Sequence, residues 1–355
     1  MRAAFVIGTL GQGGAERVMS NLANYLVRQN HEITIITLFR REPSYWLDPR
    51  VTVINGLDIS IKLNAIRLLR QQIKKTTPDI VLSFMTHINI LTIVAMWGLD
   101  IPVVVSERSD PKEHPSQYMR RFLRRILYPW PKGFVFQTKN AQEYFPSNIV
   151  KRSIVIPNPI YFDRKEKTKD QFREDVIVTV GRLTKAKNHR MLIRAFGEIH
   201  KRFPTYVLKI FGEGDLREEL KEYVSLLDLD GPVRLMGSSN TIIKEIDKCK
   251  IFVLSSDYEG MPNALIEALA VGLPSISTNC LSGGPEFLLS NGRGILVPVG
   301  DEQALTEAIS YLIQHPQERE LMGEQAMSIF ELLNPRIVFR DWEIYLLENC
   351  RRRKR

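Results

Sequence analysis

The sequence predicts an α/β fold divided into two lobes. Apolar, β-rich runs alternate with helical stretches along the whole chain, and 355 residues are enough for two domains. Each half opens with a buried strand followed by a glycine-containing turn. The VIPNPI segment, followed by a charged run, marks the boundary. We therefore expect lobes at residues 1–158 and 159–335, and a C-terminal helix with a basic tail at 336–355.

The first lobe begins with a strand at residues 3–8, a glycine loop at 8–14 and a helix at about 15–29. The loop does not have the GxGxxG spacing, which disfavours dinucleotide binding. Glycines allow the backbone to come close to a ligand, and the helix start favours anionic groups. A tight turn without a ligand is the alternative for these glycines.

A strand, turn, helix and strand at residues 251–278 form the most informative part of the second lobe. The polar turn follows the carboxyl end of an apolar strand, where open α/β sheets bind ligands. Seven residues separate Glu259, in the turn, from Glu267, in the helix. Backbone N–H groups at the start of a helix suit a phosphate or diphosphate. Those expected to do so belong to Gly260, Met261, Asn263, Ala264 and Leu265.

The segment EGMPNALIEALA resembles the EX7E motif of retaining GT-B glycosyltransferases of family 4. The resemblance implies that Glu259 contacts the donor sugar and Glu267 the ribose hydroxyls. GRLTKAKN, at residues 181–188, resembles the family pattern whose cations clamp the donor diphosphate, which implies this role for Arg182 and Lys187. Two fixed cations would stabilise the charge that develops on a departing nucleoside diphosphate.

The resemblance covers essentially the whole chain. Gly13, Gly14 and Arg17 lie in GGAER, which is found in many family 4 enzymes acting on lipid-linked sugars, and are expected to contact the donor. Gly212, in FGEG, and Met236, in MGS, are expected beside the nucleotide base, with plain strand–helix connections as the alternative. The implied GT-B fold has two Rossmann-like lobes, a cleft between them and a C-terminal helix that packs back on the first lobe.

The acceptor site is expected in the first lobe. After the strand at residues 102–106, many relatives carry a histidine near the reacting sugar, whereas this chain has Glu107 and Arg108. Arg108 cannot act as a base, but it can bind an acceptor phosphate or an oxygen of the donor sugar while Glu107 orients it. His87 is a further candidate, with a structural role as its alternative. The resemblance implies a route without an enzymic base, in which the leaving phosphate oxygen accepts the acceptor proton.

Positive charge is concentrated in the first lobe and the tail. Residues 1–158 hold 21 Lys and Arg against 11 Asp and Glu, whereas residues 159–350 hold 23 against 29. Residues 117–130 predict a basic amphipathic helix, which suits an anionic membrane surface. The expected contacts are Arg120, Arg121, Arg124 and Arg125. The alternative is that the apolar stripe packs on the core and the arginines are merely solvated.

The sequence disfavours a membrane span, a signal peptide and a metal site. No apolar run crosses a bilayer uninterrupted, and Arg2 leads directly into a strand, so we expect neither a membrane span nor a signal peptide. The 3 cysteines and 6 histidines lack the spacing of metal ligands. We expect no metal and no cofactor, and a cytoplasmic protein that is peripheral at the inner face of the cell membrane.

We therefore expect a retaining glycosyltransferase that moves a hexose or N-acetylhexosamine from a UDP-sugar to a polyprenyl-diphosphate-linked sugar in glycan or polysaccharide biosynthesis. A UDP-sugar epimerase shares the two-lobed fold but would act without a lipid acceptor. The pI of about 9.4 suggests a nucleic-acid-binding protein as a second alternative. The basic residues accompany apolar helix faces rather than a known reading module, so nucleic acid is not an expected partner.

Overall fold

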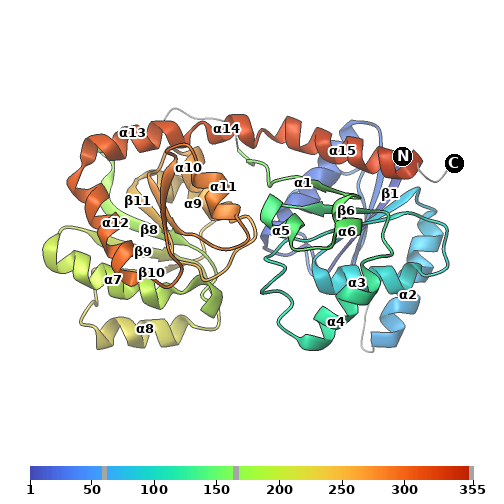
Figure 1. Ribbon diagram of the computed structural model, residues 1–355, viewed down its shortest axis with the longest axis horizontal. Coiled ribbons are helices and arrows are strands. Elements are labelled where there is room, and N and C mark those ends of the chain that lie inside the picture. Colours follow the sequence, from blue (N-terminus) through green and yellow to red (C-terminus); the bar gives the residue numbers. More distant parts are fainter. Residues whose placement is uncertain (58–61, 163–167, 352–355) are drawn as a thin grey trace. The chain divides into compact units, whose positions relative to one another are not determined.

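The computed structural model describes residues 1–57, 62–162 and 168–351. The chain forms two compact units, whose elements are labelled in Figure 1. Unit 1 comprises residues 1–159 and 335–355, and unit 2 comprises residues 160–334. The last helix therefore belongs to the same unit as the N-terminal half of the chain.

Unit 1 is built on a parallel sheet of 7 strands in the order β3-β2-β1-β4-β5-β6-β7. The strands are β1 (Arg2–Ile7), β2 (Glu32–Thr37), β3 (Thr52–Ile54), β4 (Ile80–Phe84), β5 (Val103–Ser106), β6 (Gly133–Phe136) and β7 (Ser153–Val155). The strand order reverses at β1, where Phe5 lies between Ile35 of β2 and Leu82 of β4. β4 and β5 are buried along their whole length, as is typical of a parallel sheet covered on both faces.

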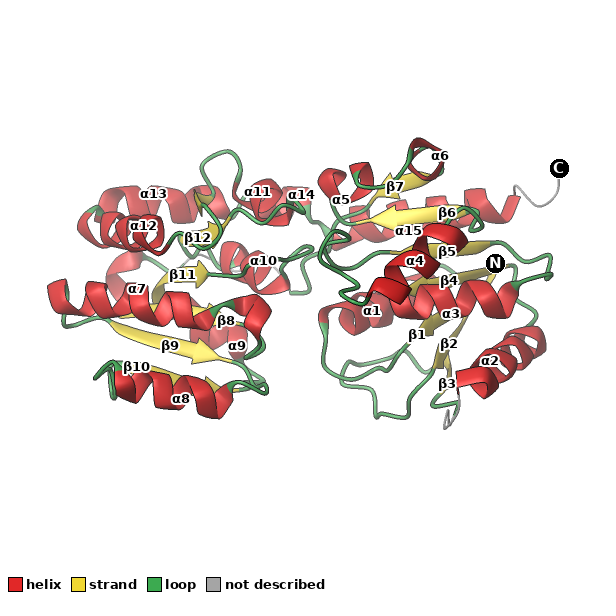
Figure 2. Ribbon diagram, turned by 60° about the horizontal axis from the view of Figure 1, so that its bottom comes forward, coloured by secondary structure: helices red, strands yellow, loops and turns green. Residues whose placement is uncertain are grey.

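Helices cover this sheet, as Figure 2 shows. They are α1 (Gly14–Arg28), α2 (Lys62–Thr76), α3 (Thr86–Met96), α4 (Tyr118–Leu127), α5 (Lys139–Glu143), α6 (Ser147–Val150) and α15 (Pro335–Arg351). The C-terminal helix α15 packs on unit 1, as expected from the sequence. Its Trp342 is fully buried against the ring of Phe84, with the ring centroids 5.6 Å apart. Its Tyr345 hydroxyl accepts a hydrogen bond of 2.9 Å from the backbone N–H of Phe134.

Unit 2 is built on a parallel sheet of 6 strands in the order β10-β9-β8-β11-β12-β13. The strands are β8 (Glu174–Val180), β9 (Val207–Phe211), β10 (Val233–Gly237), β11 (Cys249–Leu254), β12 (Ser275–Thr278) and β13 (Gly294–Val297). The helices are α7 (His189–Arg202), α8 (Arg217–Leu226), α9 (Ile242–Asp247), α10 (Asn263–Ala270), α11 (Gly284–Leu289), α12 (Glu302–Gln314), α13 (Pro316–Ala326) and α14 (Ile329–Leu332), with short 3-10 helices at η1 (Asp170–Phe172) and η2 (Lys185–Lys187).

The strand order in unit 2 reverses between β8 and β11. Successive side chains of these strands point to opposite faces of the sheet. Ile177 and Val253 lie in one core cluster together with α7, whereas Val178 and Phe252 lie in another together with α10. The connections that leave β8 and β11 therefore run to opposite faces. Such a reversal leaves room for a ligand at the carboxyl ends of the two strands.

Candidate active site

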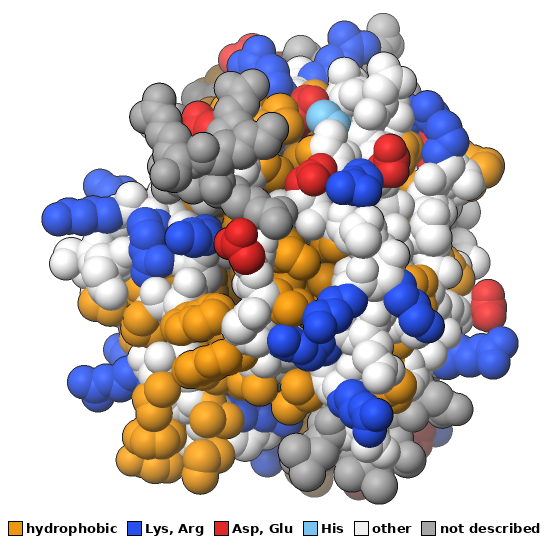
Figure 3. Space-filling model, turned by 90° about the vertical axis from the view of Figure 1, so that its right-hand side faces the viewer, with side chains coloured by type: hydrophobic (Ala, Val, Ile, Leu, Met, Phe, Trp, Pro, Cys, Tyr) orange, Lys and Arg blue, Asp and Glu red, His pale blue; other side chains and the backbone are white. Residues whose placement is uncertain are grey.

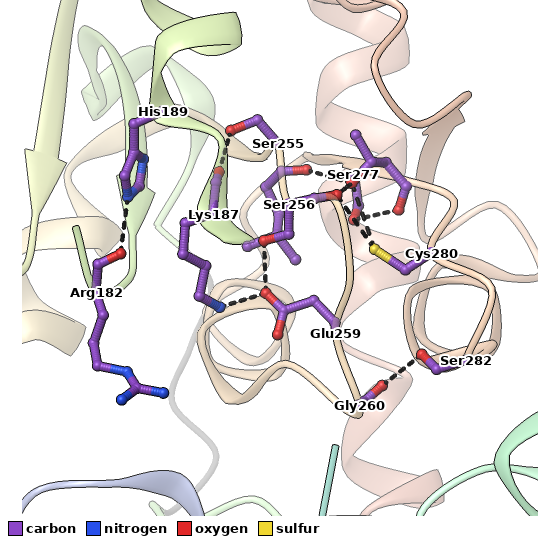
Figure 4. A network of polar contacts seen from close by, with 12 residues as sticks. Arg182, Lys187, His189, Ser255, Ser256, Glu259, Gly260, Ser277, Cys280 and Ser282 are labelled. Atoms are coloured by element: carbon purple, nitrogen blue, oxygen red, sulfur yellow. Dashed lines mark hydrogen bonds and ion pairs between the residues drawn. The ribbon is translucent and has the colours of Figure 1, made fainter. Parts of the chain in front are cut away.

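Three of the expected donor residues of unit 2 lie in the turns that follow β8 and β11. The first turn carries Arg182 and Lys187, and the second carries Glu259. The two strands pair in parallel, so both turns begin at the same edge of the sheet. Figure 4 shows the Lys187 and Glu259 side chains pointing toward each other.

Lys187 and Glu259 form a direct ion pair. The Lys187 ammonium donates a hydrogen bond to Glu259 Oε1, and the Ser256 hydroxyl donates to the same oxygen at 2.6 Å (Figure 4). The side chains of the pair are only 19% and 12% exposed. Partial burial reduces screening by salt and makes the attraction stronger than in a surface pair. The turns thus hold a cation and a carboxylate side by side, which suits a ligand with both anionic and hydroxyl groups.

Backbone and side-chain hydrogen bonds hold the two turns together. Ser255 Oγ donates to the carbonyls of Lys187 and Asn188, at 2.9 and 3.2 Å. The N–H of Asp257 donates to the carbonyl of Ala186 at 2.8 Å, and Asn188 Nδ2 donates to Asp257 Oδ1 at 2.7 Å. The backbone positions of Lys187 and Glu259 are therefore fixed relative to each other.

His189, the first residue of α7, supports the turn after β8 from the inside. It is 3% exposed, and its Nε2 donates to the carbonyl of Arg182 at 3.3 Å. Burial lowers the pKa of His189 to about 4, so the ring is neutral at ordinary pH. The Arg182 side chain is exposed and extends away from His189 in Figure 4. This leaves the guanidinium accessible to an anionic ligand.

The ends of β8, β9 and β10 approach each other so closely that glycine is required at Gly212. Its φ is +140°, and a Cβ there would lie 2.0 Å from the carbonyl oxygen of Gly181. The N–H of Gly212 donates to the carbonyl of Gly237 at 2.8 Å. Met236, one residue before, is 43% exposed. The structure thus assigns a local role to Gly212, and it leaves the Met236 side chain able to contact a ligand.

Helix α10 begins at Asn263 and buries Glu267, which is 7% exposed. The side chains of Met261 and Leu265 are packed in the hydrophobic core. At these two positions only the backbone can contact a ligand, whereas Asn263 and Ala264 are half-buried.

The turn before α10 is held by the start of α11. Ser282 Oγ donates to the carbonyl of Gly260 at 3.2 Å. A Cβ on Gly284 would lie 1.9 Å from the same oxygen. This close approach explains Gly284 at the start of α11, whereas Gly283 before it has a φ of +76°. The contact fixes the backbone that carries Glu259.

The expected site residues of unit 1 follow β1, β4 and β5, three neighbouring strands. Gly13 and Gly14 precede or open α1, and the N–H of Gly13 donates to the Tyr45 hydroxyl at 3.3 Å. Arg17 lies half-buried in the first turn of α1. His87 is exposed near the start of α3, and its pKa is lowered by partial desolvation and by the nearby charge of Arg120. All of these residues lie at the carboxyl edge of the sheet.

Glu107 is not placed to contact an acceptor, contrary to the expectation. It is 2% exposed, and its carboxylate accepts hydrogen bonds from Thr86, at 2.7 Å, and from Tyr128. Burial raises the pKa of Glu107 above its ordinary value. The carboxylate therefore belongs to the core of unit 1. Its hydrogen bonds from Thr86 and Tyr128 offset the cost of burying it.

Arg108 remains a candidate contact for an acceptor. Its guanidinium donates to Asn158 Oδ1 and lies over the ring of Phe84, 4.8 Å from the centroid. Gln137 Nε2 donates to the same Asn158 oxygen at 2.8 Å. Asn158, in the VIPNPI segment, thus orients Arg108. The hydrogen bonds of Glu107 described above come from Thr86 and Tyr128 instead.

The prediction that Arg124 contacts the membrane is wrong. The structure buries it at 4% exposure, and it donates to the carbonyls of His114 and Pro111 at 2.7 and 2.8 Å. Its guanidinium also lies 5.2 Å from the centroid of the Tyr144 ring. Arg124 therefore anchors α4 to the loop before it. Arg120, Arg121 and Arg125 are exposed, as expected.

The outer face of α4 is apolar as well as basic. The alternative that the whole apolar stripe packs on the core is wrong, because Leu123 and Leu127 turn inward while other large apolar side chains are exposed. The exposed ones are Tyr118, Met119, Phe122 and Ile126, continued by Trp130 and Trp97. The rings of Trp97 and Trp130 stack with centroids 4.9 Å apart. In Figure 3, hydrophobic side chains gather beside Lys and Arg on one face. We call these six residues the apolar face of α4.

Sequence reasoning missed Ser255 and Ser256. Their position between β11 and Glu259 was the only signal, and it does not show what their hydroxyls bind. Among the described residues, no group of three or more His, Cys, Asp or Glu side chains is placed to hold a metal ion. In the same part of the chain, none of the helices has the length and apolar character needed to cross a membrane.

Two family descriptions match this chain. "Glycosyl transferases group 1" matches residues 162–328, and "Glycosyltransferase Family 4" matches residues 12–164. The first range falls within unit 2, and the second falls almost entirely within unit 1.

Two relatives from Campylobacter jejuni align along most of the chain. One is GalNAc-alpha-(1->4)-GalNAc-alpha-(1->3)-diNAcBac-PP-undecaprenol alpha-1,4-N-acetyl-D-galactosaminyltransferase, which is 30% identical over 337 residues that cover 92% of each chain. The other is N-acetylgalactosamine-N,N'-diacetylbacillosaminyl-diphospho-undecaprenol 4-alpha-N-acetylgalactosaminyltransferase, which is 28% identical over 364 residues that cover 96% of this chain and 98% of the relative.

Solved structures share the two-lobed fold. HepE of Anabaena, solved in complex with UDP-glucose, matches with a TM-score of 0.82 at 18% identity over 98% of this chain and 100% of HepE. TarM matches with a TM-score of 0.81 at 12% identity over 97% of this chain and 98% of TarM. At these identities the likeness concerns the fold alone.

Proposed function

This chain belongs to the glycosyltransferases of group 1 and family 4, and on that premise we propose that it is a retaining enzyme that uses a UDP-sugar. It would move a hexose or N-acetylhexosamine to a membrane-anchored, polyprenyl-diphosphate-linked sugar in glycan or polysaccharide assembly. The observation that carries the proposal is the contact between Lys187 and Glu259 in two turns tied together at the switch point of unit 2. The names of the two Campylobacter relatives, which act on undecaprenol-linked substrates, support the acceptor class.

In the proposed site, Arg182 and Lys187 bind the donor diphosphate and Glu259 binds the sugar. Glu267 binds the ribose, and the backbone at Gly260 and the start of α10 lies along the phosphates. Arg182 has an exposed guanidinium and Lys187 a half-buried ammonium, which supports the assignment of these two cations to the diphosphate. Gly212 and Met236 would complete the part of the donor site that lies in unit 2.

The proposed reaction replaces one bond of the anomeric carbon with another on the same face. The bond from this carbon to the β-phosphate oxygen breaks, and a bond to an acceptor hydroxyl oxygen forms. The departing phosphate oxygen accepts the proton of that hydroxyl, so no enzymic base is needed. Arg182 and Lys187 stabilise the negative charge that develops on UDP, where each well-placed donor contributes roughly 2–4 kcal/mol. The proposal includes no metal and no resident cofactor, because these cations fill that role.

We place the acceptor at the carboxyl edge of the unit 1 sheet. Arg108 would bind an acceptor phosphate or hydroxyl, because Asn158 and the Phe84 ring hold its guanidinium in a defined orientation. His87 is exposed near the start of α3 and would contact the acceptor as a neutral ring. Glu107 has no direct role in this proposal.

We propose that the enzyme is cytoplasmic and binds the anionic inner surface of the cell membrane through α4. Arg120, Arg121 and Arg125 are exposed beside the apolar face of α4. Aromatic rings and arginines together suit the interface between headgroups and acyl chains. The lipid anchor of the acceptor would enter the enzyme from this surface.

Incubation of the protein with a panel of UDP-, GDP- and ADP-sugars tests the function. Each donor is supplied with and without a short polyprenyl-diphosphate-linked glycan, and nucleotide release is measured. Turnover of one UDP-sugar only with the lipid acceptor is expected, and an α-linked product from an α-linked donor, seen by NMR, would establish retention. Conversion of the donor without an acceptor would instead indicate an epimerase.

A further inference from the structure

The ion pair of Lys187 and Glu259 affects how tightly the site binds the donor and the product. Under the proposed function these two side chains bind different parts of the donor, the diphosphate and the sugar. In the structure they bind each other instead. A donor therefore enters a site whose cation already has a partner.

We propose that Glu259 competes with the donor diphosphate for Lys187, so that the site favours the intact UDP-sugar over the product UDP. Ser256 acts as a positioning residue that keeps Glu259 in place when Lys187 turns to the diphosphate. This inference rests on the proposed function, and it deepens that function by stating how one ion pair distinguishes donor from product.

Glu259 has different partners when the intact donor is bound and when UDP is bound. When a diphosphate binds Lys187, the half-buried carboxylate loses its cation, and such a loss is costly unless other donors replace it. An intact donor brings sugar hydroxyls, which can donate to Glu259. UDP lacks the transferred sugar and its hydroxyls, so Glu259 attracts Lys187 away from the diphosphate and lowers the affinity for the product.

The surroundings of Ser256 fix it for this role. It is fully buried, and its hydroxyl donates to Glu259 Oε1 at 2.6 Å. Its carbonyl accepts hydrogen bonds from Thr278 Oγ1, at 2.5 Å, and from the Cys280 thiol, at 3.4 Å. Both of these side chains are buried as well. Ser256 is therefore tied to the end of β12 and does not depend on Lys187 for its position.

Calorimetric titration of the full chain with UDP tests the competition. Glu259→Gln keeps the shape of the side chain but removes its charge, and we expect it to bind UDP on the order of tenfold more tightly than the wild type. Lys187→Gln should bind UDP more weakly, and adding Glu259→Gln to it should bring no gain. Glu302→Gln is the matched control, because Glu302 also forms an ion pair in unit 2, with Arg194, but lies at the surface.

Equal or weaker UDP binding by Glu259→Gln would overturn the inference, and so would a gain that persists without Lys187. A wild-type protein that transfers sugar while Glu259→Gln shows no gain overturns this inference alone. A wild-type protein that neither binds UDP nor transfers sugar overturns the proposed function as well.

The positioning role of Ser256 needs a second readout. Ser256→Ala should lower kcat about tenfold or more, because Glu259 loses the donor that orients it. UDP affinity should stay within about twofold, since Lys187 and Glu259 still pair. A thermal unfolding midpoint near that of the wild type shows that the variant is folded. An unchanged kcat would contradict the role.

Discussion

The hydroxyl of Tyr128 donates a hydrogen bond to the carboxylate of Glu107 inside unit 1, and both side chains are almost fully buried. Burial raises the pKa of Glu107 above its usual 4.5. The folded state therefore binds this proton more tightly than the unfolded state, and the contribution of Glu107 to stability falls as the pH rises from 4.5 through the raised pKa.

Glu107→Gln should remove this dependence on pH. The amide keeps an oxygen for Tyr128 and can donate to Thr86, but it does not ionise. Thermal unfolding of both proteins between pH 4 and 7 measures the effect. The variant should gain stability relative to the wild type as the pH rises, and parallel curves would contradict the burial of an ionisable Glu107.

His189 predicts a dependence of opposite sign. Its pKa is lowered from 6.5 to about 4 by burial, so the unfolded chain takes up the proton first as the pH falls. The contribution of His189 to the stability of unit 2 is thus lost between pH 6.5 and 4, by roughly 3 kcal/mol. In His189→Gln this loss should be absent, because the amide does not titrate. Urea unfolding at pH 7 and pH 4.5 compares the two, and an equal loss would show that the ring is not buried as a neutral group.

Arg124 and Arg125 are neighbours with different expected roles. Arg124→Ala should destabilise the protein by roughly 2–4 kcal/mol, because buried carbonyls lose a charged donor. Arg125→Ala should change stability by less than about 0.5 kcal/mol. Urea unfolding measures both.

The Arg125→Ala variant also tests the membrane proposal. Arg125→Ala should weaken sedimentation with vesicles containing phosphatidylglycerol, since a basic residue near an anionic surface contributes about 1 kcal/mol. Vesicles of phosphatidylcholine alone are the control. Binding to anionic vesicles that is the same for the wild type and for Arg125→Ala would count against α4 as the docking surface.

Gly212 and Gly231 form a second matched pair, because both have positive φ values, +140° and +99°. A Cβ would collide with the Gly181 carbonyl in Gly212→Ala but would meet nothing within 4 Å in Gly231→Ala. Each should lose roughly 1 kcal/mol to backbone strain, and only Gly212→Ala should lose more. Turnover should fall with it, because the clash displaces the turn that carries Arg182. Equal losses in the two variants would mean that the turns can separate without cost.

The order of elements and the place of each motif were predictable from the sequence, because both follow from local patterns. The strands β1 and β11 are mostly apolar runs, and the glycine turn and the EGMPNALIEALA segment follow these strands. The packing of the C-terminal helix on the first lobe was implied by the family resemblance. These features do not require knowledge of which strands become neighbours.

Features that depend on contacts between distant segments were not predictable. The ion pair of Lys187 and Glu259 arises because β8 and β11 pair, although the two residues are 72 positions apart. Helical periodicity placed Arg124 with the other arginines, but the carbonyls of the preceding loop draw it into the core. Glu107 was assigned to the acceptor because it follows a strand, whereas Thr86 and Tyr128 bury it.

Turnover of the lipid-linked acceptor by Lys187→Ala and Glu259→Ala tests the central claim most directly. Each substitution should lower kcat by about a hundredfold or more, because a donor contact at the reacting bond is lost. The thermal unfolding midpoints of both variants should stay close to that of the wild type. Full activity in either folded variant would contradict the assignment of this ion pair to the active site.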